Sequence, residues 1–107
     1  MRPSAVLLCT AATLGSALAM APAAASPELA QARLCVACHG VSEKKIGPSY
    51  QAIAARYAGQ PDAVARMAEK IRRGSSGAWG AVPMPANPKV TPDEARQLAA
   101  WLLVQKK

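Results

Sequence analysis

Residues 35–39 read Cys-Val-Ala-Cys-His, which places two thiols and an imidazole within five consecutive positions. Two thiols at this spacing can each attach to one vinyl group of a haem, and the imidazole that follows can bind the iron as an axial ligand. The pattern therefore predicts one covalently bound haem c. Cys35 and Cys38 are the expected attachment points, and His39 is the expected ligand of the iron.

Two other kinds of site also use closely spaced cysteines. A thiol pair in an exported protein can exchange disulfides, but such pairs are mounted on a mixed sheet, and this chain has few β-branched or alternating segments. A structural zinc ion needs four protein ligands, whereas outside the first 25 residues the sequence offers two Cys and one His. Covalent haem is the interpretation that uses all three residues.

A second axial ligand is expected in a long loop. Residues 74–90 are rich in Gly and Pro and lack a helical period, and a loop of this length in a small domain is usually functional. At its centre, Pro83 and Pro85 fix the backbone on both sides of Met84, and a Met sulfur opposite a His is a common ligand pair in electron carriers. Met84 is therefore the predicted ligand. The alternative is Met67, which lies on the apolar face of an expected helix, where a Met usually fills the core.

The N-terminal residues are arranged in the way that is typical of a secretory signal peptide. Arg2 precedes an apolar stretch over residues 5–19, and small residues with an Ala-x-Ala pattern follow. The stretch is too short to span a membrane. We therefore predict that residues 1–25 are a signal peptide, that Cys9 is removed with it, and that residues 26–107 form one domain in the periplasm; an uncleaved anchor is the alternative.

Four helices are expected to position the candidate ligands. Ser26 should begin the first, which continues into the Cys35 motif; Ser49 should precede the second, which Gly59 ends. The third should run from about 61–62 to Gly74, and the fourth should begin at Thr91, where Thr-Pro-Asp-Glu forms a capping box. The apolar faces of the last three helices are Tyr50, Ile53, Ala54 and Tyr57; Val64, Met67, Ala68 and Ile71; and Ala95, Leu98, Ala99 and Leu102. With no Phe to fill a small interior, an all-α domain packed around the haem is the expected fold class.

These residues together resemble a known family, the small class I cytochromes c, and in particular the cytochrome c-551 or c8 type. The resemblance covers essentially all of residues 26–107. It is carried by Cys35-x-x-Cys38-His39, Ile46-Gly47-Pro48, Gly74-x-x-Gly77-x-Trp79-Gly80-x-x-Pro83-Met84-Pro85 and Trp101. It implies a small cytochrome c fold and a soluble monohaem carrier of single electrons rather than an enzyme. The resemblance also suggests that the electron acceptor is a nitrite reductase or a terminal oxidase.

The resemblance also implies roles for four residues in the haem environment. The carbonyl of Pro48 would accept a hydrogen bond from the axial imidazole and so orient it. Trp79 would donate to a haem propionate, and Asn87 would approach the ligating sulfur. Lys70 lies where the family often has an arginine near a propionate. A lysine keeps the positive charge but lacks the planar guanidinium group. The alternatives are that Trp79 packs against the core and that Pro48 only begins a helix.

The charge of the chain indicates the kind of partner. The formal net charge is +7, and loss of Arg2 with the signal peptide leaves +6. A basic carrier suits donor and acceptor proteins with acidic docking surfaces, because opposite potentials speed encounter without tight binding. We expect no nucleic acid partner, no stable membrane insertion and a monomer. Two other functions stay open, a dedicated haem subunit of a periplasmic dehydrogenase and a haem sensor or peroxidase.

Overall fold

The computed structural model describes residue 3, residues 11–13, residue 15 and residues 26–106. Almost all of the predicted signal peptide, including Cys9 and the cleavage site, lies outside these residues, so that prediction stays a prediction. The described part is all-α, as expected, and contains no strand; its elements are α1 (Ser26–Ala32), the short 3-10 helix η1 (Cys35–Ala37), α2 (Tyr50–Tyr57), α3 (Ala63–Arg73) and α4 (Pro92–Leu103). None of the described helices has the length and apolar character needed to cross a membrane.

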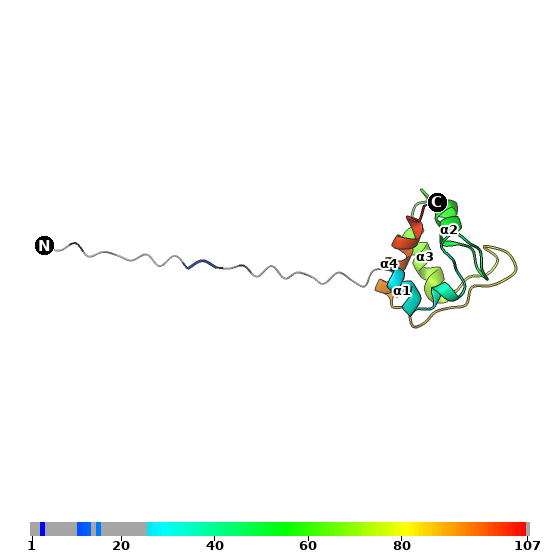
Figure 1. Ribbon diagram of the computed structural model, residues 1–107, viewed down its shortest axis with the longest axis horizontal. Helices are drawn as coiled ribbons and strands as arrows, with labels where there is room; N and C mark the ends of the chain where they lie inside the picture. Colours follow the sequence, from blue (N-terminus) through cyan, green and yellow to red (C-terminus); the bar gives the residue numbers. More distant parts are fainter. Residues whose placement is uncertain (1–2, 4–10, 14, 16–25, 107) are drawn as a thin grey trace.

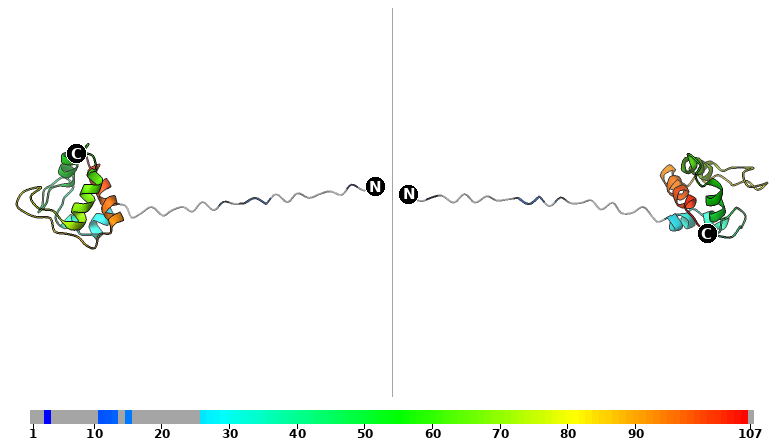
Figure 2. Two further views of the ribbon diagram at one scale, coloured as in Figure 1. Left: turned by 180° about the vertical axis from the view of Figure 1, so that it is seen from behind. Right: turned by 90° about the horizontal axis from the view of Figure 1, so that it is seen from above.

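Helix α4 is the element against which the other three helices pack. Its most extensive contact is with α3, followed by α2 and then α1 (Figure 1). The long loops leave this bundle on the side away from α4, and the two further views agree on that arrangement (Figure 2). The buried residues form one core, which consists of Leu29, Ala30, Tyr50, Ile53, Met67, Ala68, Ile71, Val90, Ala95, Leu98, Ala99 and Leu102.

The start of α4 has the capping box that the sequence predicts. The Thr91 hydroxyl accepts a 3.1 Å hydrogen bond from the Glu94 amide, and the Glu94 carboxylate accepts a 3.0 Å bond from the Thr91 amide. These two bonds satisfy amides that the first turn of a helix leaves without partners. All four predicted core residues of α4 are buried, so both the cap and the face are confirmed.

The ends of α2 and α3 also follow from local sequence. Ser49 caps α2 by accepting a 3.0 Å hydrogen bond from the Ala52 amide. Gly59 and Gly74 follow the two helices with positive φ angles of 72° and 80°, which Gly adopts at little cost. One predicted core residue is wrong, because Val64 is 38% exposed. It lies in the first turn of α3, and since α4 is the main neighbour of α3, the buried face begins one turn later.

The first helix does not continue into the cysteine motif, so this expectation was wrong. Helix α1 ends at Ala32, and Leu34 adopts a left-handed conformation with a φ of 63° before η1 begins. For a residue other than Gly this conformation costs about 1–2 kcal/mol. A tertiary contact accompanies the break, because the Asn87 side-chain amide donates a 2.9 Å hydrogen bond to the Arg33 carbonyl. That carbonyl lies at the helix end, where carbonyls lack helical partners.

Arg33 also joins the end of α1 to the start of α4. Its guanidinium donates to both carboxylate oxygens of Glu94 at 2.8–3.1 Å, and both side chains are partly shielded from solvent. The Thr91 amide and then the Arg33 guanidinium hold the pKa of the Glu94 carboxyl below its usual value of 4.5, because both stabilise the ionised form. Glu94 therefore caps one helix and binds the end of another.

We expect acid to weaken this junction. Because the pKa of Glu94 is lower in the folded state, its contribution to stability is full above pH 4.5 and is lost as the pH falls through the lowered value. The variant Glu94→Gln should lower the free energy of unfolding at neutral pH and reduce its dependence on pH below 4.5, as measured by denaturant titration at several pH values. Glu69→Gln is the control, because it removes the exposed Arg73–Glu69 pair, which should contribute little. An unchanged pH dependence in Glu94→Gln would contradict this account.

Candidate functional site

A cavity of about 550 Å³ lies between the two long loops of the domain. Its volume is in the range of small-molecule and cofactor sites. Six of the predicted site residues line it, namely Cys38, His39, Pro48, Lys70, Trp79 and Met84. Cys35 instead packs against the core beside the cavity, and Asn87 is not part of the lining. The alternative ligand Met67 also reaches the cavity, but it is 8% exposed and belongs to the core.

His39 is held by the backbone of the loop that follows it. Its Nδ1 atom lies 2.7 Å from the Pro48 carbonyl oxygen. Because a carbonyl can only accept, Nδ1 must carry the proton, and Nε2 is the nitrogen with a lone pair for a metal. The contact predicted for Pro48 is therefore present, and it fixes the tautomer that an axial ligand needs.

Gly47 allows this close approach of ring and loop. A Cβ atom at position 47 would lie 2.6 Å from the His39 Cε1 atom, closer than carbon atoms can pack. The Gly47 amide also donates a 2.8 Å hydrogen bond to the Cys38 carbonyl, and His39 forms an isolated antiparallel bridge with Lys44. The imidazole also stacks on the Tyr50 ring at a centroid distance of 5.9 Å. The ring thus lies against both the loop and the first residue of α2.

Met84 is held on the opposite wall by a second isolated bridge. Its amide donates to the Ser75 carbonyl at 2.8 Å, and its carbonyl accepts from the Ser75 amide at 3.0 Å. Gly74 makes room for this pairing, because a Cβ atom there would lie 2.6 Å from the Met84 carbonyl oxygen. Gly74 therefore does more than end α3, which was its only role in the sequence-based prediction. It lets the ligand loop return against the end of that helix.

The two cysteines lie on one short turn of backbone. The amides of Cys38 and His39 both donate to the Cys35 carbonyl, at 3.1 Å and 3.0 Å, and the two thiols are not joined to each other in a disulfide. Burial, with a smaller contribution from nearby Cys38, raises the pKa of the Cys35 thiol. A disulfide-exchange thiol has a lowered pKa, so this environment does not favour that alternative. In residues 26–106 and the few others described, no three His, Cys, Asp or Glu side chains form a cluster suited to a metal ion.

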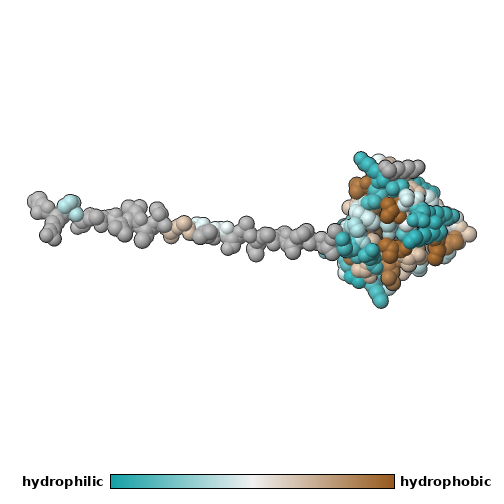
Figure 3. All heavy atoms as spheres, in the orientation of Figure 1, coloured by the Kyte–Doolittle hydropathy of each residue, from teal (hydrophilic) through white to brown (hydrophobic). Residues whose placement is uncertain are grey.

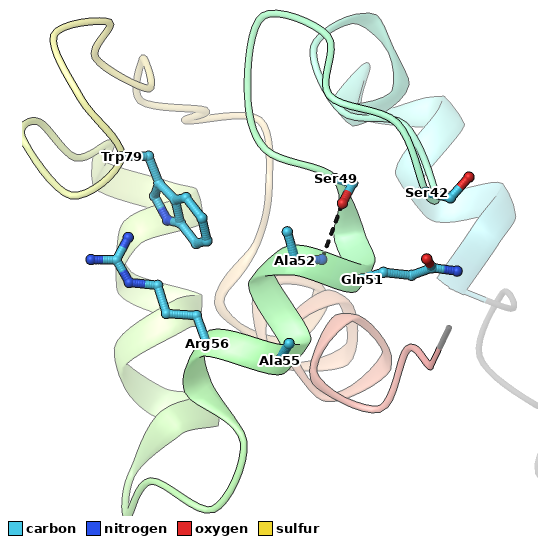
Figure 4. Close-up of a pocket in the computed structure, with 7 residues that line it drawn as sticks. All are labelled: Ser42, Ser49, Gln51, Ala52, Ala55, Arg56 and Trp79. Atoms are coloured by element: carbon cyan, nitrogen blue, oxygen red, sulfur yellow. Dashed lines mark hydrogen bonds between the residues drawn. The ribbon is translucent and has the colours of Figure 1, made fainter.

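Cations and aromatic rings form one rim of the cavity. Lys70 donates a 3.2 Å hydrogen bond to the Tyr57 hydroxyl. Although burial acts in the opposite direction, this bond and the charges of Lys70 and Arg56 lower the pKa of Tyr57. The Arg56 guanidinium lies 4.3 Å from the centroid of the Trp79 ring, and Figure 4 shows these two side chains together at a shallow pocket beside α2. Trp79 is 40% exposed and lies outside the core, which does not support the alternative that it packs there. Arg56 was not predicted, because a single basic residue on an exposed helix face carries no local signal.

Asn87, which is partly buried, and the buried Tyr50 complete the surroundings of the haem-attachment motif. Asn87 donates its side-chain amide to the Arg33 carbonyl, and the contact with the ligating sulfur implied by the resemblance stays a prediction. The Tyr50 hydroxyl is buried and has no hydrogen-bond partner in the described part of the chain. Burial, with a smaller effect of Cys35, raises the pKa of Tyr50 to about 12, so this phenol is neutral at physiological pH.

Comparison with known proteins gives the family. The family model described as cytochrome c matches residues 23–106, which is most of the chain. The chain belongs to the cytochrome c family. This cytochrome c is 46% identical to cytochrome c-551 of Pseudomonas aeruginosa over 107 residues, which cover 99% of this chain and 100% of that protein. It is 51% identical to cytochrome c-552 of Hydrogenobacter thermophilus over 79 residues, covering 74% of this chain and 80% of that protein.

A solved structure supports the same assignment. The crystal structure of cytochrome c552 from Nitrosomonas europaea matches with a TM-score of 0.73 and 46% identity, covering 75% of this chain and 99% of that one. The predicted c-551 type is thereby confirmed. This cytochrome c binds one covalently attached haem c. The described cavity suits that group, because it is lined by an imidazole with its Nε2 free, by a thioether and by Cys38.

We expect Gly47→Ala to disturb the side of the cavity on which the loop holds the His39 ring. The added methyl group must displace the ring or the loop, which should cost about 1–3 kcal/mol of unfolding free energy. Denaturant unfolding of the exported haem protein, followed by the haem Soret band, measures this loss. Gly77→Ala is a comparison variant, since a Cβ there meets nothing within 4 Å and the change tests only the cost of a positive φ, which Gly47 does not have. Unchanged stability of Gly47→Ala would show that contact with His39 is unimportant.

Proposed function

We propose that this cytochrome c carries single electrons between redox proteins in the periplasm and is not an enzyme. In this proposal Cys35 and Cys38 would attach the haem, and His39 and Met84 would bind its iron. The observation that carries the proposal is that the two candidate axial residues line one cavity, each held by an antiparallel backbone bridge. Such a cavity favours the same pair of ligands for the haem iron in its ferrous and ferric states.

The side chains contribute by holding the ligands and limiting access to the metal. When bound, the haem iron alternates between the ferrous and ferric states and so holds or releases one electron. The bond between His39 and the Pro48 carbonyl keeps Nε2 available, and Pro83 and Pro85 restrict the backbone on both sides of Met84. With His39 and Met84 both bound to the iron, a substrate would find no free position there.

The rim suits the propionate groups of the haem. Lys70 is held beside the cavity by its hydrogen bond to Tyr57, and Trp79 lines the cavity with its ring against Arg56. Carboxylates at this rim would meet the Lys70 cation and an indole N–H donor. This placement supports the roles proposed for Lys70 and Trp79, and the Arg56 guanidinium adds positive charge next to the Trp79 ring.

The net positive charge of the chain supports the proposal that its redox partners have acidic docking surfaces. Thirteen Lys and Arg against six Asp and Glu give the chain its net charge of +7. A positive surface raises the encounter rate with a negative one, and a carrier that must leave again needs no large tight interface. We accordingly propose a monomer that meets its donor and acceptor briefly. A nitrite reductase and a terminal oxidase are the acceptors to test first.

Replacement of Met84 by Leu tests the ligand assignment. The weak near-infrared band that reports charge transfer from sulfur to ferric iron should be present in the exported wild-type protein and absent in Met84→Leu. Met67→Leu is the matched control, because it exchanges a buried Met that also lines the cavity and keeps nearly the same volume. Loss of the band in Met67→Leu alone would reassign the ligand. No band in the wild type, with ready binding of carbon monoxide, would support the sensor or peroxidase alternative.

The carrier role predicts fast transfer that depends on salt. The second-order rate of electron transfer from the reduced protein to an acceptor with an acidic surface should fall at least tenfold between about 0.01 and 0.15 M ionic strength, because screening shortens the reach of the charges. Stopped-flow spectroscopy with a purified nitrite reductase and a purified terminal oxidase measures it. A salt-independent rate, or a stable complex with a co-purifying dehydrogenase, would favour a dedicated subunit instead.

A further inference from the structure

The outer part of the long loop has little backbone support. We call residues 76–83 the outer loop; it lies between the paired residues Ser75 and Met84, and all of it lines the cavity. In the part of the chain that the structure describes, the outer loop makes no hydrogen bond between backbone groups. In Figure 1 it projects away from the helices, and Figure 3, in the same orientation, shows hydrophilic and hydrophobic atoms intermingled on the face in view. A side chain from another element must therefore hold it in place.

Two glycines divide the outer loop. Gly77 and Gly80 have positive φ angles of 78° and 110°, which Gly adopts at little cost. A Cβ atom at either position would meet nothing within 4 Å, so neither glycine packs closely against another segment. The residues between them are Ala78 and Trp79. Of the whole outer loop only Ala78 is partly shielded from solvent, and the other residues are exposed. The contact that holds the loop should therefore lie at this pair.

Arg56 of α2 contacts both residues between the glycines. Its guanidinium donates a 2.5 Å hydrogen bond to the Ala78 carbonyl, which is the one hydrogen bond that the described residues make to the outer loop. The same group lies 4.3 Å from the centroid of the Trp79 ring, within the range of cation–π attraction, and Figure 4 shows the two side chains together. Tyr57 adds an edge contact with the Trp79 ring at a centroid distance of 6.5 Å. The centre of the outer loop is thus joined to the end of α2.

The guanidinium of Arg56 is suited to this double contact. Within the described residues no carboxylate pairs with it, whereas Arg33, Arg73 and Arg96 each pair with an acidic side chain. A planar guanidinium can lie on an aromatic ring and donate a hydrogen bond at the same time, which the compact ammonium group of Lys does less well. One side chain can therefore fix both the backbone and the indole ring of the outer loop.

We infer that Arg56 is a positioning residue, which holds the outer loop closed over the cavity and so keeps Met84 in place as a ligand. The bridge between Ser75 and Met84 fixes the base of the loop, and the contacts of Arg56 with Ala78 and Trp79 fix its centre. Because the outer loop leads directly into Met84, its release would let an outside ligand compete with the thioether. The inference rests on the proposed carrier function, and it names the residue that keeps the site closed.

Competition by imidazole tests the inference with the exported ferric haem protein. Imidazole should replace the Met84 sulfur when the outer loop opens, and loss of the near-infrared sulfur band reports the exchange. Arg56→Leu should lower the imidazole concentration at half-replacement about tenfold, because a charged hydrogen bond and a cation–π contact at an exposed site are lost. Arg66→Leu on α3 is the control and should change it less than twofold. Arg66 is also exposed, and its side chain makes no hydrogen bond or ion pair with the described residues.

Denaturant titration separates positioning from general stabilisation. A lower free energy of unfolding in Arg56→Leu with unchanged imidazole binding would overturn the inference, because Arg56 would then only stabilise the fold. An equal gain in imidazole binding by Arg66→Leu would also overturn it, since loss of positive charge alone would explain the effect. If the wild-type ferric protein lacks the near-infrared band, the proposed Met84 ligation fails and the inference fails with it. That outcome is distinct, because failure at Arg56 alone leaves the wild-type band in place.

Discussion

The hydrogen bond between His39 Nδ1 and the Pro48 carbonyl is the contact on which the rest of the site depends. It spans nine residues at 2.7 Å and requires the backbone to fold back on the ring, which only Gly47 permits. The same loop is joined to α2, because the Tyr50 amide donates to the Gly40 carbonyl at 2.9 Å. The imidazole, its loop and the start of α2 therefore form one unit with a fixed tautomer.

The opposite wall is built in the same way from different elements. Met84 pairs with Ser75 directly after α3, so the position of the thioether follows the end of that helix. Asn87 then returns to the Arg33 carbonyl at the end of α1, next to the haem-attachment motif. Since α3 and α1 both pack on α4, the helix bundle sets the separation of the two walls. Loops supply the ligands, and helices fix the distance between them.

The sequence predicts those features whose causes are local. The starts of α2 and α4 follow from Ser49 and from the Thr91 capping box, and the His39 and Met84 assignments follow from short motifs. The same local signals could not predict the break at Leu34, because no residue there marks a helix end and the one hydrogen bond that accompanies it comes from distant Asn87.

The remaining site features have tertiary causes. Gly47 is needed because the His39 ring folds back onto it, and Gly74 is needed because the Met84 segment passes against it. Arg56 meets Trp79 from a different element, 23 positions away in sequence. None of these contacts has a sequence pattern of its own, since each arises only when segments that are separate in the sequence are brought together. The exposed position of Val64 has the same origin in the packing of α3 on α4.

X-ray absorption at the iron edge of the exported protein tests the central claim most directly, because it counts the neighbours of the metal without relying on stability or activity. Because His39 and Met84 are each held in place, we expect the iron to have five nitrogen neighbours and one sulfur neighbour, in both the ferric and the ferrous protein. Loss of the sulfur neighbour in either oxidation state, or an iron with only five neighbours, would contradict the account.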